Sequence, residues 1–268
     1  MVSIPLVAFA AFEIVLVFAM GASVGSFLNV LVDRLPKGKS LLGRSHCDHC
    51  KKILSPIELI PIVSLLIQRG RSRCCKKLLH QKYAEVEMFT GICFVLTLVL
   101  SLSSAGNVTP AFIFRMVLIW ILLSVSIAIS LIDIKLHLIP DALQMVIIVI
   151  ALVYTYFWGQ WGEYSVLSGL VVALPILFIY LVTRGKGMGF GDVVLEIGLG
   201  IWLGAAKGLL GVYLGFLFGS VFGIVLILMK KAGRRTHIAF GPFLLAGAWV
   251  SYFAGTPILM IVKKYLGF

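Results

Sequence analysis

The chain of 268 residues is 60% hydrophobic and only 13% charged. Soluble globular domains average about 45–50% apolar and about 25% charged residues, so this composition excludes an ordinary soluble domain. Several apolar runs approach or exceed the roughly 20 residues that an α-helix needs to cross a bilayer. The sequence therefore predicts an all-α polytopic membrane protein.

Positive charge is concentrated between the first two apolar runs. Residues 34–83 hold more than half of the 23 lysine and arginine residues, and the net charge is +12. The basic residues of this segment are Arg34, Lys37, Lys39, Arg44, Lys51, Lys52, Arg69, Arg71, Arg73, Lys76, Lys77 and Lys82. A basic loop beside membrane spans marks the cytoplasmic side, and it can also contact membrane lipids with anionic headgroups. We therefore expect lipid contact and no nucleic-acid partner.

The apolar runs predict about eight transmembrane helices. In chain order they cover residues 5–31, 88–102, 112–132, 142–158, 165–183, two helices after residue 192 with a break near residues 207–208, and 240–262. The chain then divides into a first transmembrane helix (1–33), a basic cytoplasmic segment with cysteine clusters (34–87) and a transmembrane bundle (88–268). Within the basic segment, residues 53–67 are apolar but interrupted by Pro56 and Pro61. This pattern predicts a stretch that lies on the membrane surface.

The basic segment carries four cysteines in two clusters. Cys47 and Cys50 form a Cys-x-x-Cys pair, and the adjacent Cys74 and Cys75 follow later in the segment. Stable disulfides are not expected in the cytoplasm, whereas four thiolates in two clusters suit a tetrahedral zinc site. The sequence predicts structural zinc, with reduced structural cysteines as the alternative.

Two aspartates lie where apolar runs meet polar loops. Asp133 ends one run, and Asp192 lies in the glycine-rich loop 186–192 that precedes another. In the predicted topology both lie at the cytoplasmic membrane face, where an acid indicates a function or a partner. Two adjacent aspartates cannot both ionise, so the pair would support general acid–base hydrolysis of a peptide bond. Gly189 and Gly191 would let an extended substrate approach the backbone closely.

Other interpretations of these acids stay open. Aspartates at helix starts are common N-caps; Asp141, after Pro140, is predicted to be one, and Asp192 is a second candidate. Paired acids also form proton or cation sites in transporters, although the sequence shows no clear internal repeat of the kind common in transporters. A non-enzymatic assembly factor, with the basic segment as its docking surface, is a third alternative. Composition alone does not decide among these classes.

An ordered series of motifs covers nearly the whole chain. The series runs Gly25–Asn29, Arg34–Pro36, Cys47–Cys50, Glu58–Pro61, Arg69–Arg71, Tyr83, Glu87, Gly91, Asp133, Ile139–Asp141, Gly189–Asp192 and Phe240–Phe243. It resembles the prepilin peptidases, also called type IV leader peptidases, which belong to the GxGD intramembrane aspartyl proteases.

The resemblance implies both an activity and its substrates. Asp133 and Asp192 would be the catalytic pair of an aspartic endopeptidase. The substrates would be type IV prepilin and pseudopilin precursors, whose short basic leader would be removed at the cytoplasmic face of the bacterial inner membrane. Many family members also N-methylate the new N-terminus with S-adenosylmethionine, so a methyltransferase activity is implied too. Glu87 and Gly91 are candidates for the methyl-donor site, with helix packing as the alternative.

The chain departs from the family pattern at both candidate sites. The family's second cysteine pair is usually Cys-x-x-Cys, but Ser72 stands at its first position and Cys74 is displaced. A zinc site could recruit Cys74 or one of the histidines His46, His49 and His80. Near the second aspartate, Val194 replaces the lysine that is usual there. Glu196 lies one helical turn after Asp192, where it either adds negative charge beside the aspartates or pairs with a neighbouring helix.

Overall fold

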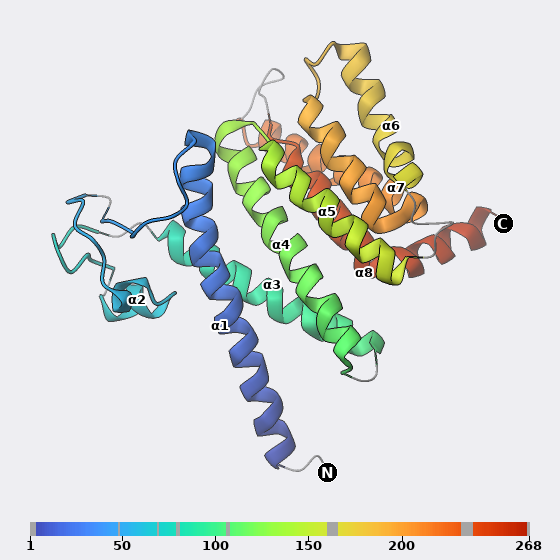
Figure 1. Ribbon diagram of the computed structural model, residues 1–268. Helices are drawn as coiled ribbons and strands as arrows, with labels where there is room; N and C mark the ends of the chain where they lie inside the picture. Colours follow the sequence, from blue (N-terminus) through green and yellow to red (C-terminus); the bar gives the residue numbers. More distant parts are fainter. Residues whose placement is uncertain are drawn as a thin grey trace. The chain divides into compact units, whose positions relative to one another are not determined.

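The structure is a computed structural model that describes residues 4–47, 49–68, 70–78, 81–105, 108–159, 166–231 and 238–266. Within these ranges the secondary structure is helical apart from isolated β-bridges. The long helices are α1 (Ile4–Arg34), α3 (Lys82–Ala105), α4 (Pro110–Leu136), α5 (Asp141–Trp158), α6 (Val166–Thr183), α7 (Phe190–Leu228) and α8 (Gly241–Leu266) (Figure 1). Each contains a stretch long and apolar enough to cross a membrane, which confirms the predicted all-α multi-pass membrane protein.

The chain divides into two compact units, residues 1–128 and 129–268. In the first unit, α1 packs along α3 through glycines. A Cβ atom built on Gly21 would lie 2.9 Å from the Cα atom of Gly91, and one built on Gly25 would lie 2.8 Å from the Cα atom of Glu87. These distances leave no room for a side chain, so the glycines let the two helix backbones approach closely.

The segment between α1 and α3 contains three short helices and two turns. The short helices are η1 (Leu35–Lys37), η2 (Pro56–Leu59) and α2 (Val63–Ile67). Two antiparallel bridges, His46 with Ile53 and Arg71 with Leu78, each close one turn. A segment with so little regular structure buries a small core, and domains of this kind usually depend on a disulfide or a metal for stability.

In the second unit, glycines on α7 face α8. A Cβ atom built on Gly211 would lie 3.2 Å from the Cα atom of Ala248, and one built on Gly215 would lie 3.0 Å from that of Leu244. The residue numbers rise along α7 as they fall along α8, so the two helices run antiparallel. The four-residue spacing of the glycines places them on one helical face, which explains this close packing.

Helix α7 explains why the described residues contain seven long apolar helices and not about eight. It has 39 residues, and its backbone leaves the helical conformation at Gly204, with φ 77° and ψ 168°. A straight helix of that length would span about 58 Å, roughly twice the hydrocarbon thickness of a bilayer. The two predicted helices are thus the two halves of α7. The predicted break near residues 207–208 is wrong by about one turn, because the left-handed φ that only glycine adopts readily lies at Gly204.

Candidate active site and metal centre

Asp133 lies in the last turn of α4, which ends before His137, a residue with φ 53°. Its side chain is 5% exposed, and its Oδ2 atom accepts a hydrogen bond of 2.9 Å from the backbone N–H of Gly241. Gly241 is the first residue of α8, and the first N–H groups of a helix have no partner within the helix and carry partial positive charge. A Cβ atom built on Gly241 would lie 2.8 Å from this same carboxyl oxygen. Only glycine therefore allows this amide to reach Asp133.

Asp192 is the third residue of α7 and is also buried. Its Oδ2 atom accepts a hydrogen bond of 3.0 Å from the backbone N–H of Gly189, the N-cap of the helix. The preceding loop turns through two residues with positive φ, Arg184 and Gly185. Asp192 thus contacts the helix start that its own loop creates. The N-cap of α7 is therefore Gly189 and not Asp192, the second candidate; the hydrogen bond from the N-cap amide fixes one oxygen of the Asp192 carboxyl group.

Ile139 and Gln144 connect the surroundings of the two aspartates. The buried Gln144 donates from Nε2 to the backbone carbonyls of Ile139 and Gly191, both at 3.3 Å. A Cβ atom built on Gly191, the neighbour of Asp192, would lie 3.4 Å from the Cβ atom of Ile139. A Cβ atom built on Gly241, which binds Asp133, would lie 3.4 Å from Ile139 Cδ1. Ile139 thus lies beside both the glycine next to Asp192 and the glycine that binds Asp133, so the structure places the two predicted residues in one region of the second unit.

Two further acids in this region have different surroundings. The N-cap of α5 is Pro140, and no side chain caps the helix. The prediction that Asp141 is an N-cap is therefore wrong: Asp141 is the first helical residue, and the fixed φ of proline suits the position before it. Glu196 is 2% exposed, and its Oε1 atom has no hydrogen-bond partner among the described residues. Asp192 acts on it electrostatically, which agrees with negative charge added beside the aspartates.

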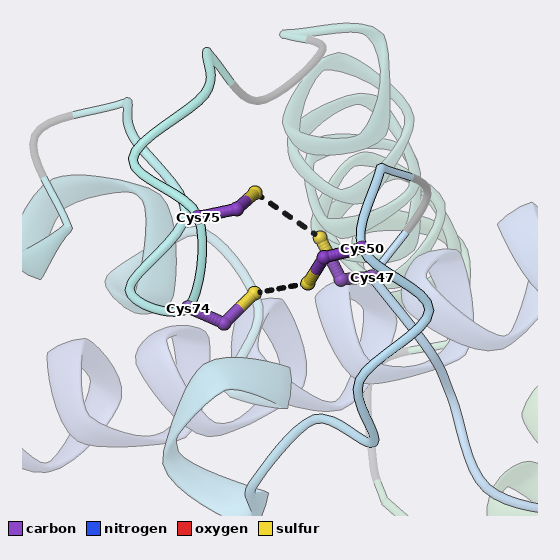
Figure 2. Close-up of side chains that lie close together, drawn as sticks. All are labelled: Cys47, Cys50, Cys74 and Cys75. Carbon is purple, nitrogen blue, oxygen red and sulfur yellow. Dashed lines mark hydrogen bonds between the residues drawn. The ribbon is translucent and has the colours of Figure 1, made fainter.

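The four predicted cysteine ligands meet in one cluster. The Sγ atoms of Cys47, Cys50, Cys74 and Cys75 all lie within 4.8 Å of one another. Figure 2 shows them pointing together from two turns, with Cys47 and Cys75 in contact at 3.8 Å and Cys50 and Cys74 at 2.9 Å. Sulfurs around a tetrahedral zinc ion lie about 3.8 Å apart, given a Zn–S bond of about 2.3 Å. The four thiols are therefore a donor set that suits zinc, with Cys47 and Cys75 at this spacing and Cys50 and Cys74 closer together; His80 lies outside the described residues.

The two turns of the cluster have the same backbone structure. In the first, Cys47 donates its N–H to the carbonyl of Lys52 at 2.8 Å; in the second, Ser72 donates to that of Lys77, also at 2.8 Å. Each turn contains a residue with nearly the same positive φ, 61° at position 51 and 59° at position 76. The two turns are therefore structurally equivalent, and residues 72–75 of the second correspond one by one to residues 47–50 of the first.

This equivalence explains the irregular second cysteine pair. Ser72 occupies the position of Cys47, and Cys75 occupies that of Cys50. Cys74 corresponds to His49 and not to a cysteine of the first turn, yet its Sγ atom lies 3.0 Å from the Oγ atom of Ser72. Cys74 thus supplies the fourth sulfur from a neighbouring position. A hydrogen bond from the backbone N–H of Cys50 lowers the pKa of Cys47 to about 6, which favours the thiolate that binds metal.

The first unit also contains a cavity that the sequence did not predict. Its volume is about 280 Å³, and it lies among the end of α1, the start of α3 and the segment between them. Glu87, a predicted candidate for the methyl-donor site, lines this cavity, whereas Gly91 is not among the lining residues. A Cβ atom built on Gly91 would lie 2.8 Å from the ring of Phe18, so this glycine serves helix packing. Three separate stretches form the walls, and no single motif could show that they meet.

The seven apolar helices and the two buried aspartates at helix ends define a multi-pass membrane protein whose candidate reactive groups are paired carboxyls. Residues 19–101 match the bacterial Peptidase A24 N-terminal domain, and residues 120–228 match the type IV leader peptidase family. The chain belongs to this family of prepilin peptidases. No solved structure matches it significantly.

Several relatives cover nearly the whole chain. The prepilin leader peptidase/N-methyltransferase of Stutzerimonas stutzeri is 31% identical, over 93% of this chain and 92% of the relative. The protein of that name from Aeromonas hydrophila is 30% identical, over 91% of each chain. That from Pseudomonas aeruginosa is 29% identical, over 93% of each chain. These matches confirm the predicted family, a peptidase that is also named as an N-methyltransferase.

Proposed function

We propose that this protein removes the short basic leader of type IV prepilin and pseudopilin precursors, and then N-methylates the new N-terminus. Family membership supports the substrate class and both activities. The observation that carries the peptidase half is the pair of buried aspartates, each of which accepts a hydrogen bond from an amide at the start of a helix.

The proposed cleavage uses Asp133 and Asp192 as a general base and a general acid. Two neighbouring buried carboxyls cannot both ionise, so one holds a proton. The ionised group takes a proton from water, which attacks the scissile carbonyl, while the protonated group donates to the carbonyl oxygen. The C–N bond then breaks as the first group gives its proton to the leaving amine, and the second group takes its proton back from the oxygen. The amides of Gly241 and Gly189 hold one oxygen of each carboxyl in place. No side chain becomes bonded to the substrate in this reaction.

The test uses purified protein and a prepilin substrate. Asp133→Asn and Asp192→Asn should each lower the cleavage rate by about a hundredfold or more, because proton transfer by a positioned side chain contributes about 10²–10⁴-fold. Asp141→Asn is the matched control: this exposed acid begins α5 and caps no helix, so we expect wild-type cleavage. A wild-type rate in either of the first two variants would end the aspartate-pair proposal.

We infer that the cysteine cluster holds structural zinc. Bound zinc would link the two turns and stabilise a segment with little core of its own. Cys47, Cys50, Cys74 and Cys75 would be the ligands, and Ser72 would hydrogen-bond to the thiolates at 3.6 Å from Cys47 and 3.0 Å from Cys74. Metal analysis of the purified protein should give one zinc per chain, and Cys47→Ser with Cys50→Ser should remove it.

We propose that the basic segment lies at the cytoplasmic face of the inner membrane and contacts lipid, so that leader cleavage occurs on this side. Apolar side chains of η2 and α2 are exposed in the described residues, among them Ile57 at 52% and Ile67 at 53%. Apolar groups beside lysines and arginines suit the surface of an anionic bilayer. The test labels the cysteine of the Ile57→Cys variant with a lipid-soluble and a water-soluble thiol reagent. If the segment contacts lipid, the lipid-soluble reagent should label this cysteine and the water-soluble reagent should not.

For methylation, S-adenosylmethionine would supply a methyl group that passes from sulfur to the new α-amine, with the electron pair of the broken bond staying on sulfur and a proton leaving the amine. The chain's own residues must bind this donor and hold the amine beside it. Mass spectrometry of a processed pilin's N-terminus reports the cut site and the added methyl group together.

A further inference from the structure

The cavity of the first unit combines several kinds of side chain. Three acids line it, Asp33, Glu58 and Glu87, together with the cation Arg34 and the aromatic Tyr83. Apolar groups, including Val30, Leu54 and Leu59, and uncharged or histidine side chains, including Asn29, Gln68 and His49, complete the walls. The volume of about 280 Å³ lies near the lower end of the roughly 300–1,000 Å³ found for small-molecule sites. Mostly apolar walls with a few convergent polar groups are the usual form of such sites.

Glu87, which lines the cavity, holds a strained turn of the segment between α1 and α3 in place. The side chain is 8% exposed, and its Oε2 atom accepts a hydrogen bond of 2.8 Å from the backbone N–H of Ile62. Ile62 has φ 62°, a conformation that β-branched residues rarely adopt. Backbone strain of this kind concentrates at ligand sites. A buried acid of the cavity therefore also fixes an unfavourable backbone conformation in the segment between α1 and α3.

The other two acids are also held in defined positions. Glu58 accepts hydrogen bonds at its Oε2 atom from the backbone N–H of Ser55 at 2.8 Å and from the Ser55 hydroxyl at 2.9 Å. The backbone hydrogen bond lowers the pKa of Glu58, so this group carries a negative charge at neutral pH. The Oδ2 atom of Asp33 accepts a hydrogen bond of 3.4 Å from the hydroxyl of Tyr83. The cavity thus offers fixed acidic groups to a ligand.

We propose that this cavity binds S-adenosylmethionine, which rests on the methyltransferase half of the proposed function. The acids suit the cationic sulfonium and ammonium groups and the ribose hydroxyls of this ligand. Arg34 suits its carboxylate, because the guanidinium group can bind both oxygens. The apolar walls and Tyr83 suit the adenine ring. The observed set of side chains therefore matches each part of the methyl donor.

The experiment measures binding of radiolabelled S-adenosylmethionine to the zinc-loaded, full-length protein by equilibrium dialysis. Glu87→Gln keeps an oxygen that accepts the N–H of Ile62 but removes the charge. We expect a dissociation constant about ten- to a hundredfold higher than that of the wild type, as for the loss of one hydrogen bond to a charged group. Glu85→Gln is the matched control, since Glu85 lies on the same helix, is exposed and does not line the cavity. It should bind like the wild type.

Asp33→Asn gives a second measurement on another wall, and thermal unfolding shows whether each variant is folded. If folded Glu87→Gln and Asp33→Asn both bind as tightly as the wild type, the cavity is not the donor site, although the proposed function stands. If the wild type binds no donor, the cavity proposal and the methylating half fail together. Leader cleavage in the same wild-type sample then shows whether the peptidase half survives.

Discussion

Gly241 lies so close to Asp133 that a side chain at this position would crowd the carboxyl group. Replacement by alanine would put a Cβ atom 2.8 Å from Asp133 Oδ2 and separate the carboxyl from the amide that binds it. Loss of such a hydrogen bond costs about 1.5–3 kcal/mol. We expect Gly241→Ala to lower the cleavage rate about ten- to a hundredfold.

Gly223→Ala is the control for this substitution. A Cβ atom built on Gly223 would meet only Ile238 Cδ1, at 3.7 Å, which is ordinary contact. Its cleavage rate should equal that of the wild type. Equal rates for Gly241→Ala and wild type would show that the amide of residue 241 does not matter for the reaction.

The equivalence of the two cysteine turns predicts an exchange of ligands. Cys74→Ser should lower the zinc content measured by mass spectrometry of the metal, because one of four thiolates is lost. Adding Ser72→Cys to this variant restores the spacing of the first turn and should restore one zinc per chain. A zinc content that stays low in the double variant would mean that residue 72 cannot take the ligand position.

The four cysteines illustrate what the sequence could and could not predict about a site. Their clustering predicted a metal centre, since two pairs of thiols in a segment predicted to be cytoplasmic have few other uses. The displaced Cys74 could not be placed, because its role depends on two turns having equal backbones. The contacts of Gln144 were missed for a related reason: one acceptor, Ile139, precedes α5, and the other, Gly191, lies in the first turn of α7.

At the scale of elements, the short helix η2 depends on Ser55 and Glu58. Because folding lowers the Glu58 pKa, its stabilisation is present above the pKa of the unfolded chain and is lost as the pH falls through the folded-state value. Glu58→Gln should therefore speed local hydrogen exchange in residues 55–60 at pH 7, by a loss of about 0.5–2 kcal/mol. The difference from wild type should shrink at acidic pH. A pH-independent difference would contradict the role of the charge.

The long helices were predictable because apolar runs of sufficient length have few alternatives in a bilayer. The position of the break in α7 was not. Glycines recur every four residues along this helix, and the sequence pattern does not show which of them adopts a left-handed conformation. The charge of Lys207 suggested a loop, whereas the backbone departs from the helix at Gly204.

At the scale of the whole molecule, the two units differ in what stabilises them. The second consists of long helices packed through glycines, whereas the segment 35–81 of the first has short elements closed by the cysteine cluster. Chelation of zinc should therefore open residues 38–78 to proteases while fragments of α5 to α8 stay intact, as read by mass spectrometry of the digest. Cys93→Ser changes a cysteine outside the cluster and should digest like the wild type. Equal digestion before and after chelation would contradict a stabilising metal.

Main-chain amides, not charged side chains, bind the carboxyl groups of Asp133 and Asp192. A main-chain donor survives substitutions that preserve the backbone and do not crowd the carboxyl as a side chain at residue 241 would, so the proposed reaction geometry is insulated from sequence drift at the other flanking positions. This tolerance accounts for Val194 in a place where the family usually carries lysine: the helix starts can orient both acids without help from that cation.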